Sequence, residues 1–233
     1  MSKSSRKSFA IIAIIVGAAG IGIGAYTIAT IGADIDQSLP MPTNPSSESA
    51  LHPSALNGSP VLGSLDAPIT VVEFGDYQCS KCQRFALQTK PLIIENYINT
   101  GKAQLVFKDF TVYGSDSING AIATHCAAEQ NMFWELHNYL YQNQKAINSG
   151  WLSAENIRNF TLDLGLNMAQ FNKCFDERKY LMKVTKNFEE GRSIGVSGTP
   201  TFIIIGPDGQ STRVSGAQPF KVFQQVLDKM LVG

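Results

Sequence analysis

The sequence has little that would hold a metal ion or bind nucleic acid. Its 233 residues contain only four cysteines and three histidines, and the formal net charge is zero. This balance leaves no excess of positive charge for a phosphate backbone, so we expect no nucleic-acid partner. A single Cys-x-x-Cys pair is present, and His52, His125 and His137 lack the spacing of a second ligand pair. We therefore expect neither a metal site nor a bound cofactor.

Charge is also missing from a long run near the start of the chain. Residues 9–33 contain no charged side chain, and at about 1.5 Å per residue such a helix can cross the roughly 30 Å hydrocarbon core of a bilayer. Lys3, Arg6 and Lys7 precede the run and acids follow it. This asymmetry predicts a cytoplasmic N-terminus at residues 1–8 and an outward-facing remainder. We expect a single uncleaved transmembrane helix, with a cleaved signal peptide as the alternative.

Residues 34–66 lack any regular apolar pattern. Pro, Ser and Asn dominate this stretch, which is typical of a flexible linker. The sequence therefore predicts a folded domain at residues 67–233, which is long enough to bury a core of its own and is held away from the membrane.

The predicted domain begins with a β–α–β unit. A β-branched apolar strand is expected at residues 69–74, followed by a helix from Cys79 that Pro91 kinks or divides, and then by a second strand. A crossover of this kind implies parallel strands. A helical block without strands follows at about 115–193, and then a strand at 201–205, its hairpin partner and a final amphipathic helix.

One cysteine pair lies where the first strand gives way to the helix. Cys79 and Cys82 stand in the stretch EFGDYQCSKCQRF, separated by Ser80 and Lys81. A disulfide this short stabilises a fold little by chain entropy, and a Cys-x-x-Cys at a helix start is typical of dithiol chemistry. The unpaired N–H groups and the positive dipole end favour the attacking thiolate of Cys79, and Lys81 adds a positive charge. Cys82, nearly one turn further on, can attack a mixed disulfide and release the other protein.

Three separated motifs resemble those of one enzyme family. The stretches VVEFGDYQCSKCQRF, CAAEQNMFWELHNYLYQNQ and GVSGTPTFIIIG appear in the order found in the DsbA-like thiol–disulfide oxidoreductases of the thioredoxin superfamily. The resemblance covers about residues 67–231 and implies an α/β thioredoxin fold, in which the helical block is an insertion. Ser80 and Lys81 differ from the dipeptides of the best-known members. Because this dipeptide tunes the redox potential, the resemblance does not extend to oxidant strength.

The resemblance also implies roles for residues far from the cysteine pair. It implies a cis peptide between Thr199 and Pro200 against the pair, where the Thr199 backbone can bind a substrate chain as an added strand. The alternative is that Pro200 only starts an edge strand. It further places Glu73, six residues before Cys79, as a buried acid that relays the proton of Cys82. The alternative is that Glu73 faces outward.

The two remaining cysteines, Cys126 and Cys174, both fall in the helical block. Outside the cytoplasm such cysteines usually pair, and some members of the family have a second, structural disulfide there. Free buried thiols are the alternative. His125 and His137 are expected on a helix surface or in the core rather than in catalysis.

These expectations combine into a membrane-anchored, monomeric thiol–disulfide oxidoreductase that faces outward. We expect its Cys79–Cys82 disulfide to be donated to secreted or surface proteins. The sequence predicts no separate dimerisation domain, which argues against a dedicated isomerase. A disulfide reductase, for example in cytochrome assembly, is the alternative enzyme. A thioredoxin-fold binding or chaperone module with regulatory cysteines is the alternative outside enzymes. The resemblance implies a membrane partner of the DsbB or VKOR type that reoxidises the pair.

Overall fold

The computed structural model describes residues 58–232. The predicted transmembrane helix at residues 9–33 and most of the predicted linker lie outside this range. Within it, no helix combines the length and the apolar character needed to cross a membrane.

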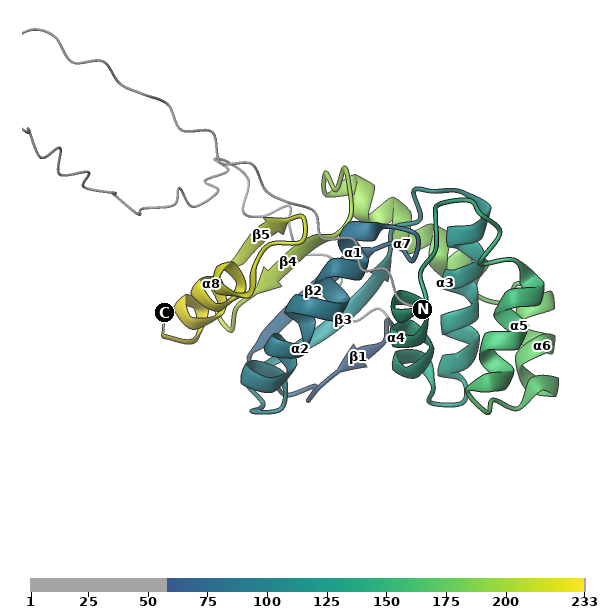
Figure 1. The fold of residues 1–233 in the computed structure, drawn as a ribbon. Helices are drawn as coiled ribbons and strands as arrows, with labels where there is room; N and C mark the ends of the chain where they lie inside the picture. Colours follow the sequence, from purple (N-terminus) through teal and green to yellow (C-terminus); the bar gives the residue numbers. More distant parts are fainter. Residues whose placement is uncertain (1–57, 233) are drawn as a thin grey trace, which may run out of the picture. The chain divides into compact units, whose positions relative to one another are not determined.

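A five-stranded mixed sheet lies at the centre of the described residues (Figure 1). β2 and β3 run parallel, as the predicted crossover requires, and the other neighbouring strands run antiparallel. The strands follow the order β1 (Val61–Leu62), β3 (Ala103–Asp109), β2 (Ile69–Gly75), β4 (Thr201–Ile205) and β5 (Ser211–Ser215).

Alternate residues of the central strand β2 face different helices. Ile69 and Val71 pack into an apolar cluster with Phe223 of α8 (Phe220–Val232). Val72, on the opposite face, belongs to a second cluster against which Phe188 of α7 (Leu181–Ser193) packs. The period of two residues in a strand therefore explains why β2 is apolar throughout: helices cover both faces of the sheet.

An interrupted helix connects β2 to β3. Pro91 lies in the first turn of α2, where its missing N–H group costs least, at the point where the sequence predicted a kink or a division. The successive segments are α1 (Ser80–Arg84), the π-helical η2 (Phe85–Thr89), α2 (Lys90–Ile93) and the π-helical η3 (Ile94–Ile98).

The predicted helical block is present between β3 and β4. It begins at Ser115 and ends at Ser193, which matches the expected range. A disulfide joins Cys126 of its first helix to Cys174, with 5.8 Å between the two Cα atoms. The helices are α3 (Ser115–Ala128), α4 (Phe133–Gln142), α5 (Ala154–Asp163), α6 (Met168–Asp176) and α7 (Leu181–Ser193).

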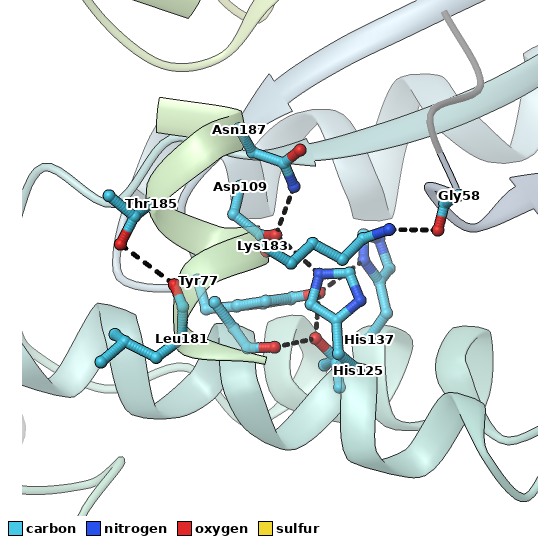
Figure 2. Close-up of polar contacts among 11 residues, drawn as sticks. Gly58, Tyr77, Asp109, His125, His137, Leu181, Lys183, Thr185 and Asn187 are labelled. Atoms are coloured by element: carbon cyan, nitrogen blue, oxygen red, sulfur yellow. Dashed lines mark hydrogen bonds and ion pairs between the residues drawn. The ribbon is translucent and has the colours of Figure 1, made fainter. Parts of the chain in front are cut away.

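Buried polar contacts attach this helical block to the sheet (Figure 2). The Asp109 carboxylate, at the end of β3, lies 2.7 Å from His125 Nε2 and accepts a hydrogen bond from Asn187 Nδ2 at 2.8 Å. His137 Nδ1 lies 3.1 Å from the hydroxyl group of Tyr77. Both histidines are buried, so they occupy the core rather than a helix surface.

Strand β1 corrects the predicted domain boundary. Val61 and Leu62 fall within the predicted linker at 34–66, yet they pair antiparallel with β3. Trp134 Nε1 also donates a hydrogen bond to the Val61 carbonyl oxygen at 3.1 Å. Two residues are too few for an alternating pattern, and the pairing depends on the free edge of β3, so the sequence did not reveal this strand. The domain therefore begins before Val61, not at residue 67.

Candidate active site

The two cysteines of the Cys-x-x-Cys pair lie at the start of α1. Cys79 is the N-cap residue of this helix and Cys82 lies in its first turn, and both are free thiols. Cys79 is 3% exposed, whereas Cys82 is fully buried. The outer sulfur is therefore the one that can meet another protein.

The environment of Cys79 favours its thiolate. The pKa of this thiol is lowered to about 6, chiefly by the hydrogen bond with the Cys82 side chain. Burial opposes this change, while the Thr199 side chain and the backbone N–H groups of Cys82 and Lys81 reinforce it. The leading contribution of Lys81 is thus its main-chain amide at the helix start, whereas the sequence pointed to its charge. The side chains of Ser80 and Lys81 are exposed.

Cys82 differs from Cys79 because it is enclosed by the protein. Burial, followed by the hydrogen bond to Cys79, raises its pKa well above the ordinary value of a thiol. At neutral pH the pair therefore consists of an outer thiolate and an inner thiol.

The loop before β4 reaches the reactive sulfur. A cis peptide bond joins Thr199 to Pro200. The Thr199 carbonyl oxygen lies 3.3 Å from Cys79 Sγ, across 120 residues of sequence, and accepts a hydrogen bond from it when the sulfur is a thiol. The backbone of Thr199 therefore lies directly beside the sulfur.

The acid in β2 is enclosed by the sheet. Glu73 is 1% exposed and is paired in register with Phe107 on one side and Phe202 on the other. Burial raises the pKa of its carboxyl group to about 8, and the nearby positive charge of Lys90 opposes the rise. A carboxyl group with this pKa can hold or release a proton near neutral pH, and its charge helps to raise the pKa of the Cys82 thiol.

Comparisons with known proteins agree with this geometry. A family model described as thioredoxin matches residues 55–229. Over 160 residues the chain is 32% identical to a probable disulfide bond formation protein D of Bacillus anthracis, which covers 65% of this chain and 74% of that protein. This chain is a DsbA-like member of the thioredoxin superfamily. It is accordingly a thiol–disulfide oxidoreductase.

Two solved structures show the same fold. Oxidised BdbD from Bacillus subtilis has a TM-score of 0.69 and 24% identity, covering 76% of this chain and 94% of its own. The α-DsbA1 protein of Wolbachia pipientis has a TM-score of 0.68 and 25% identity, covering 79% of this chain and 96% of its own. The expected α/β thioredoxin fold with a helical insertion is confirmed.

Asp76 organises the loops around the cysteines of this DsbA-like domain. Its carboxylate accepts hydrogen bonds from the backbone N–H groups of Gln78 at 2.8 Å and Val112 at 2.7 Å. It also accepts one from Ser117 Oγ at 2.6 Å. Asp76 therefore fixes the turn before Cys79 against the loop after β3.

Sequence reasoning missed a buried lysine behind the cysteine pair. Lys90 is 3% exposed, and its Nζ atom donates a hydrogen bond to Asn138 Oδ1 at 2.7 Å. Lysine is almost never buried unless it is paired, so the sequence offered no reason to place it inside. The π-helical turns of η2 also change which side of the helix faces the core, and no apolar periodicity predicts that shift.

A groove of about 620 Å³ lies beside α1. Lys81 and Arg84 line it, together with Thr89 and the loop from Ser215 to Pro219. The Gly216 N–H group donates a hydrogen bond to the Pro200 carbonyl oxygen at 2.8 Å, which connects this loop to the Thr199–Pro200 segment. The groove therefore adjoins the place where a bound chain would meet Cys79.

Proposed function

We propose that this protein oxidises pairs of thiols in secreted or surface proteins with its Cys79–Cys82 disulfide. The observation that carries the proposal is the low pKa of Cys79, at about 6, beside the buried thiol of Cys82. A stable thiolate stabilises the reduced form of the pair, which makes the disulfide more oxidising. The reverse reaction, disulfide reduction, is favoured when the reduced form lacks this stabilisation.

Each step of the proposed reaction has a group to perform it. A substrate thiolate attacks Cys79 Sγ, the S–S bond breaks, and the departing sulfur of Cys82 takes a proton from Glu73. The second substrate thiolate then attacks the substrate sulfur of the mixed disulfide, and Cys79 leaves as a thiolate. The substrate loses two electrons to the cysteine pair, and the low pKa of Cys79 makes it a good leaving group.

Two surfaces beside Cys79 suit an extended substrate chain. The Thr199 backbone, next to the sulfur, would pair with the chain as an added strand, and Pro200 would support that segment. The groove lined by Lys81 and Arg84 would take the residues that flank the substrate cysteine.

We place this activity outside the cytoplasm, in a monomer anchored by residues 9–33. The uncharged run after Lys3, Arg6 and Lys7 supports this orientation. The Cys126–Cys174 disulfide also suits an oxidising compartment, and we assign it a structural role. Relatives named for disulfide bond formation support an oxidative role, and a membrane oxidase of the DsbB or VKOR type would restore the Cys79–Cys82 disulfide.

The reduction potential of the Cys79–Cys82 pair tests the direction. We expect equilibration with glutathione to give a value closer to the about −120 mV of DsbA than to the about −270 mV of thioredoxin. The oxidised protein should also convert a peptide dithiol to its disulfide one for one, whereas the Cys79→Ala variant should not. A potential near that of thioredoxin would favour the reductase. A wild-type protein without any thiol exchange would favour the binding module.

A further inference from the structure

Two basic side chains line the groove beside α1. Lys81 and Arg84 lie three residues apart in this helix, a spacing that brings side chains to one helical face, and both are exposed. Among the described residues, the other members of the groove wall carry no charge: Gln88, Thr89 and the loop from Ser215 to Pro219. The groove therefore presents only positive charge to a molecule that binds in it.

The rest of the domain does not neutralise these two cations. Within residues 58–232, no carboxylate forms an ion pair with Lys81 or Arg84. Like charges three residues apart on a helix repel each other, and an anion placed between them relieves that repulsion. The pKa of Cys79 is lowered by the main-chain amide of Lys81, and the ammonium charge is not among the leading causes. Both charges are therefore left for a bound molecule.

A hydrogen bond holds Arg84 at the groove. Its Nη2 atom donates to the Ala217 carbonyl oxygen at 3.2 Å, in the loop between β5 and α8. The planar guanidinium group carries further N–H donors, whose spacing matches the two oxygens of a carboxylate. Because the side chain is already restrained, less conformational entropy is lost when a carboxylate binds. The geometry at Arg84 thus suits an acidic side chain.

The same loop connects the groove with the place of the substrate backbone. The Gly216 N–H group donates to the Pro200 carbonyl oxygen at 2.8 Å, and Thr89 Oγ1 donates to the Gln218 carbonyl oxygen at 3.2 Å. A chain that pairs with the Thr199 backbone as an added strand would continue along this loop into the groove. Side chains of a strand alternate between its two faces, so residues two positions from the substrate cysteine share the side of the cysteine.

We propose that the groove selects substrates in which an acidic side chain lies two residues from the cysteine that reacts with Cys79. The substrate carboxylate lies between Lys81 and Arg84 and accepts hydrogen bonds from both. The inference rests on the proposed function and deepens it, because it names the chemistry of the substrate segment that the same site prefers. Lys81 and Arg84 determine specificity in this proposal and take no part in the exchange of sulfurs.

The size of the preference follows from the exposure of the two cations. Ion pairs in contact with water are individually weak, so two of them should favour an acidic peptide by about fivefold in kcat/KM at low salt. At 1 M salt the screening length falls to about 3 Å, and the preference should fall below about twofold. A preference that rests on apolar contacts would instead persist in salt.

Competition between peptides tests the groove. Three reduced dithiol peptides of equal length carry Glu, Gln or Lys two residues to either side of each cysteine. The oxidised protein reacts with their mixture, and mass spectrometry gives the ratios of kcat/KM. A flanking charge also changes the reactivity of the peptide thiol itself, so each ratio is divided by that of the Lys81→Gln/Arg84→Gln variant. We expect this corrected ratio to favour Glu over Gln by about fivefold and to disfavour Lys. A fourth peptide, with its glutamates moved to the ends, should show no preference.

Charge variants separate the groove from the total charge of the protein. Lys81→Glu/Arg84→Glu should reverse the order and favour the lysine peptide. Lys173→Gln/Lys229→Gln removes the same total charge from exposed positions on α6 and α8 and should keep the wild-type ratios. A corrected ratio near one would overturn the proposal, and so would an equal loss of preference in the Lys173/Lys229 control. Lys81→Gln keeps the bond from Arg84 to its loop, should lower the preference to about twofold, and serves alone if the double variant does not fold.

The groove and the proposed oxidase can fail separately. A thioredoxin-like potential would refute the oxidase, yet the reduced protein should then attack disulfide-bonded forms of the same peptides with the same order of preference. If no thiol exchange occurs at all, equilibrium binding of peptides with serine in place of cysteine gives the same comparison. Equal rates for the acidic and neutral peptides, after correction, would refute the groove and leave the oxidase standing.

Discussion

Loss of the Cys126–Cys174 disulfide should destabilise the protein far more than reduction of Cys79–Cys82. The first bridge closes a loop of 48 residues between α3 and α6. Chain entropy alone then predicts about 4 kcal/mol of stabilisation at 25 °C for this loop, against about 1.6 kcal/mol for the three-residue separation of the second bridge. The net stabilisation by the Cys79–Cys82 disulfide is smaller still, because the Cys79 thiolate stabilises the reduced form.

The perturbation is the double substitution Cys126→Ala and Cys174→Ala. We expect the free energy of unfolding in urea to fall by roughly 2–4 kcal/mol, since measured values usually lie at or below the chain-entropy estimate. For a domain of this size, each 1 kcal/mol corresponds to roughly 2–4 °C in Tm. Reduction of Cys79–Cys82 alone, under mild dithiothreitol, should leave the unfolding transition unchanged or raise it.

Activity provides the control. The double variant should still oxidise a peptide dithiol at a temperature where it is folded, because neither substituted cysteine contacts the reacting sulfurs in the proposed steps. A loss of stability below about 1 kcal/mol would refute the chain-entropy reasoning. Free alkylation of Cys126 and Cys174 in the oxidised native protein would show that they form no disulfide, and the prediction would lose its basis. Loss of thiol exchange in the folded variant would refute the division between structural and reactive pairs.

The remaining predictions concern the reactive thiolate and the domain boundary. Alkylation of reduced Cys79 should follow a pH profile with a midpoint near 6. Cys82→Ala should raise that midpoint, because the hydrogen bond from Cys82 is the largest cause of the lowered pKa of Cys79. A wild-type midpoint near the ordinary value of about 8.5 would contradict this prediction. Lys81→Gln should move the midpoint by less than about half a unit, because the main-chain amide remains. The lowered pKa of Cys79 should raise the stability of the reduced protein relative to the oxidised one as the pH rises from about 6 to about 8.5, because the opposing effect of the raised pKa of Glu73 acts on both forms. Chemical unfolding of both forms at several pH values measures this difference. A chain that starts at residue 67 should unfold at a lower urea concentration than one that starts at residue 58, because it lacks β1 and exposes the edge of β3. Equal unfolding midpoints of the two chains would contradict a domain that begins before Val61.

The sequence by itself determined the features that depend on neighbouring residues. An apolar β-branched stretch, a Cys-x-x-Cys pair and a helical pattern stand in succession, so the strand, the helix start and the chemistry of Cys79 and Cys82 could all be predicted there. The extent of the helical block at 115–193 was also predictable, because helix periodicity and the glycines that end helices are local signals. The order of the three motifs was enough to indicate the DsbA-like family.

Only the tertiary structure decided how distant residues combine around the sulfurs. The Thr199 carbonyl oxygen lies 3.3 Å from Cys79 Sγ because β4 pairs with β2, and no local pattern encodes that distance. The same holds for β1, which exists because β3 offers a free edge. The proton affinities of Glu73 and Lys90 depend on desolvation by the sheet, η2 and α4, and burial is a property of the whole packed core. A glutamate and a lysine 17 positions apart in the sequence thus shift each other's pKa only when the chain folds.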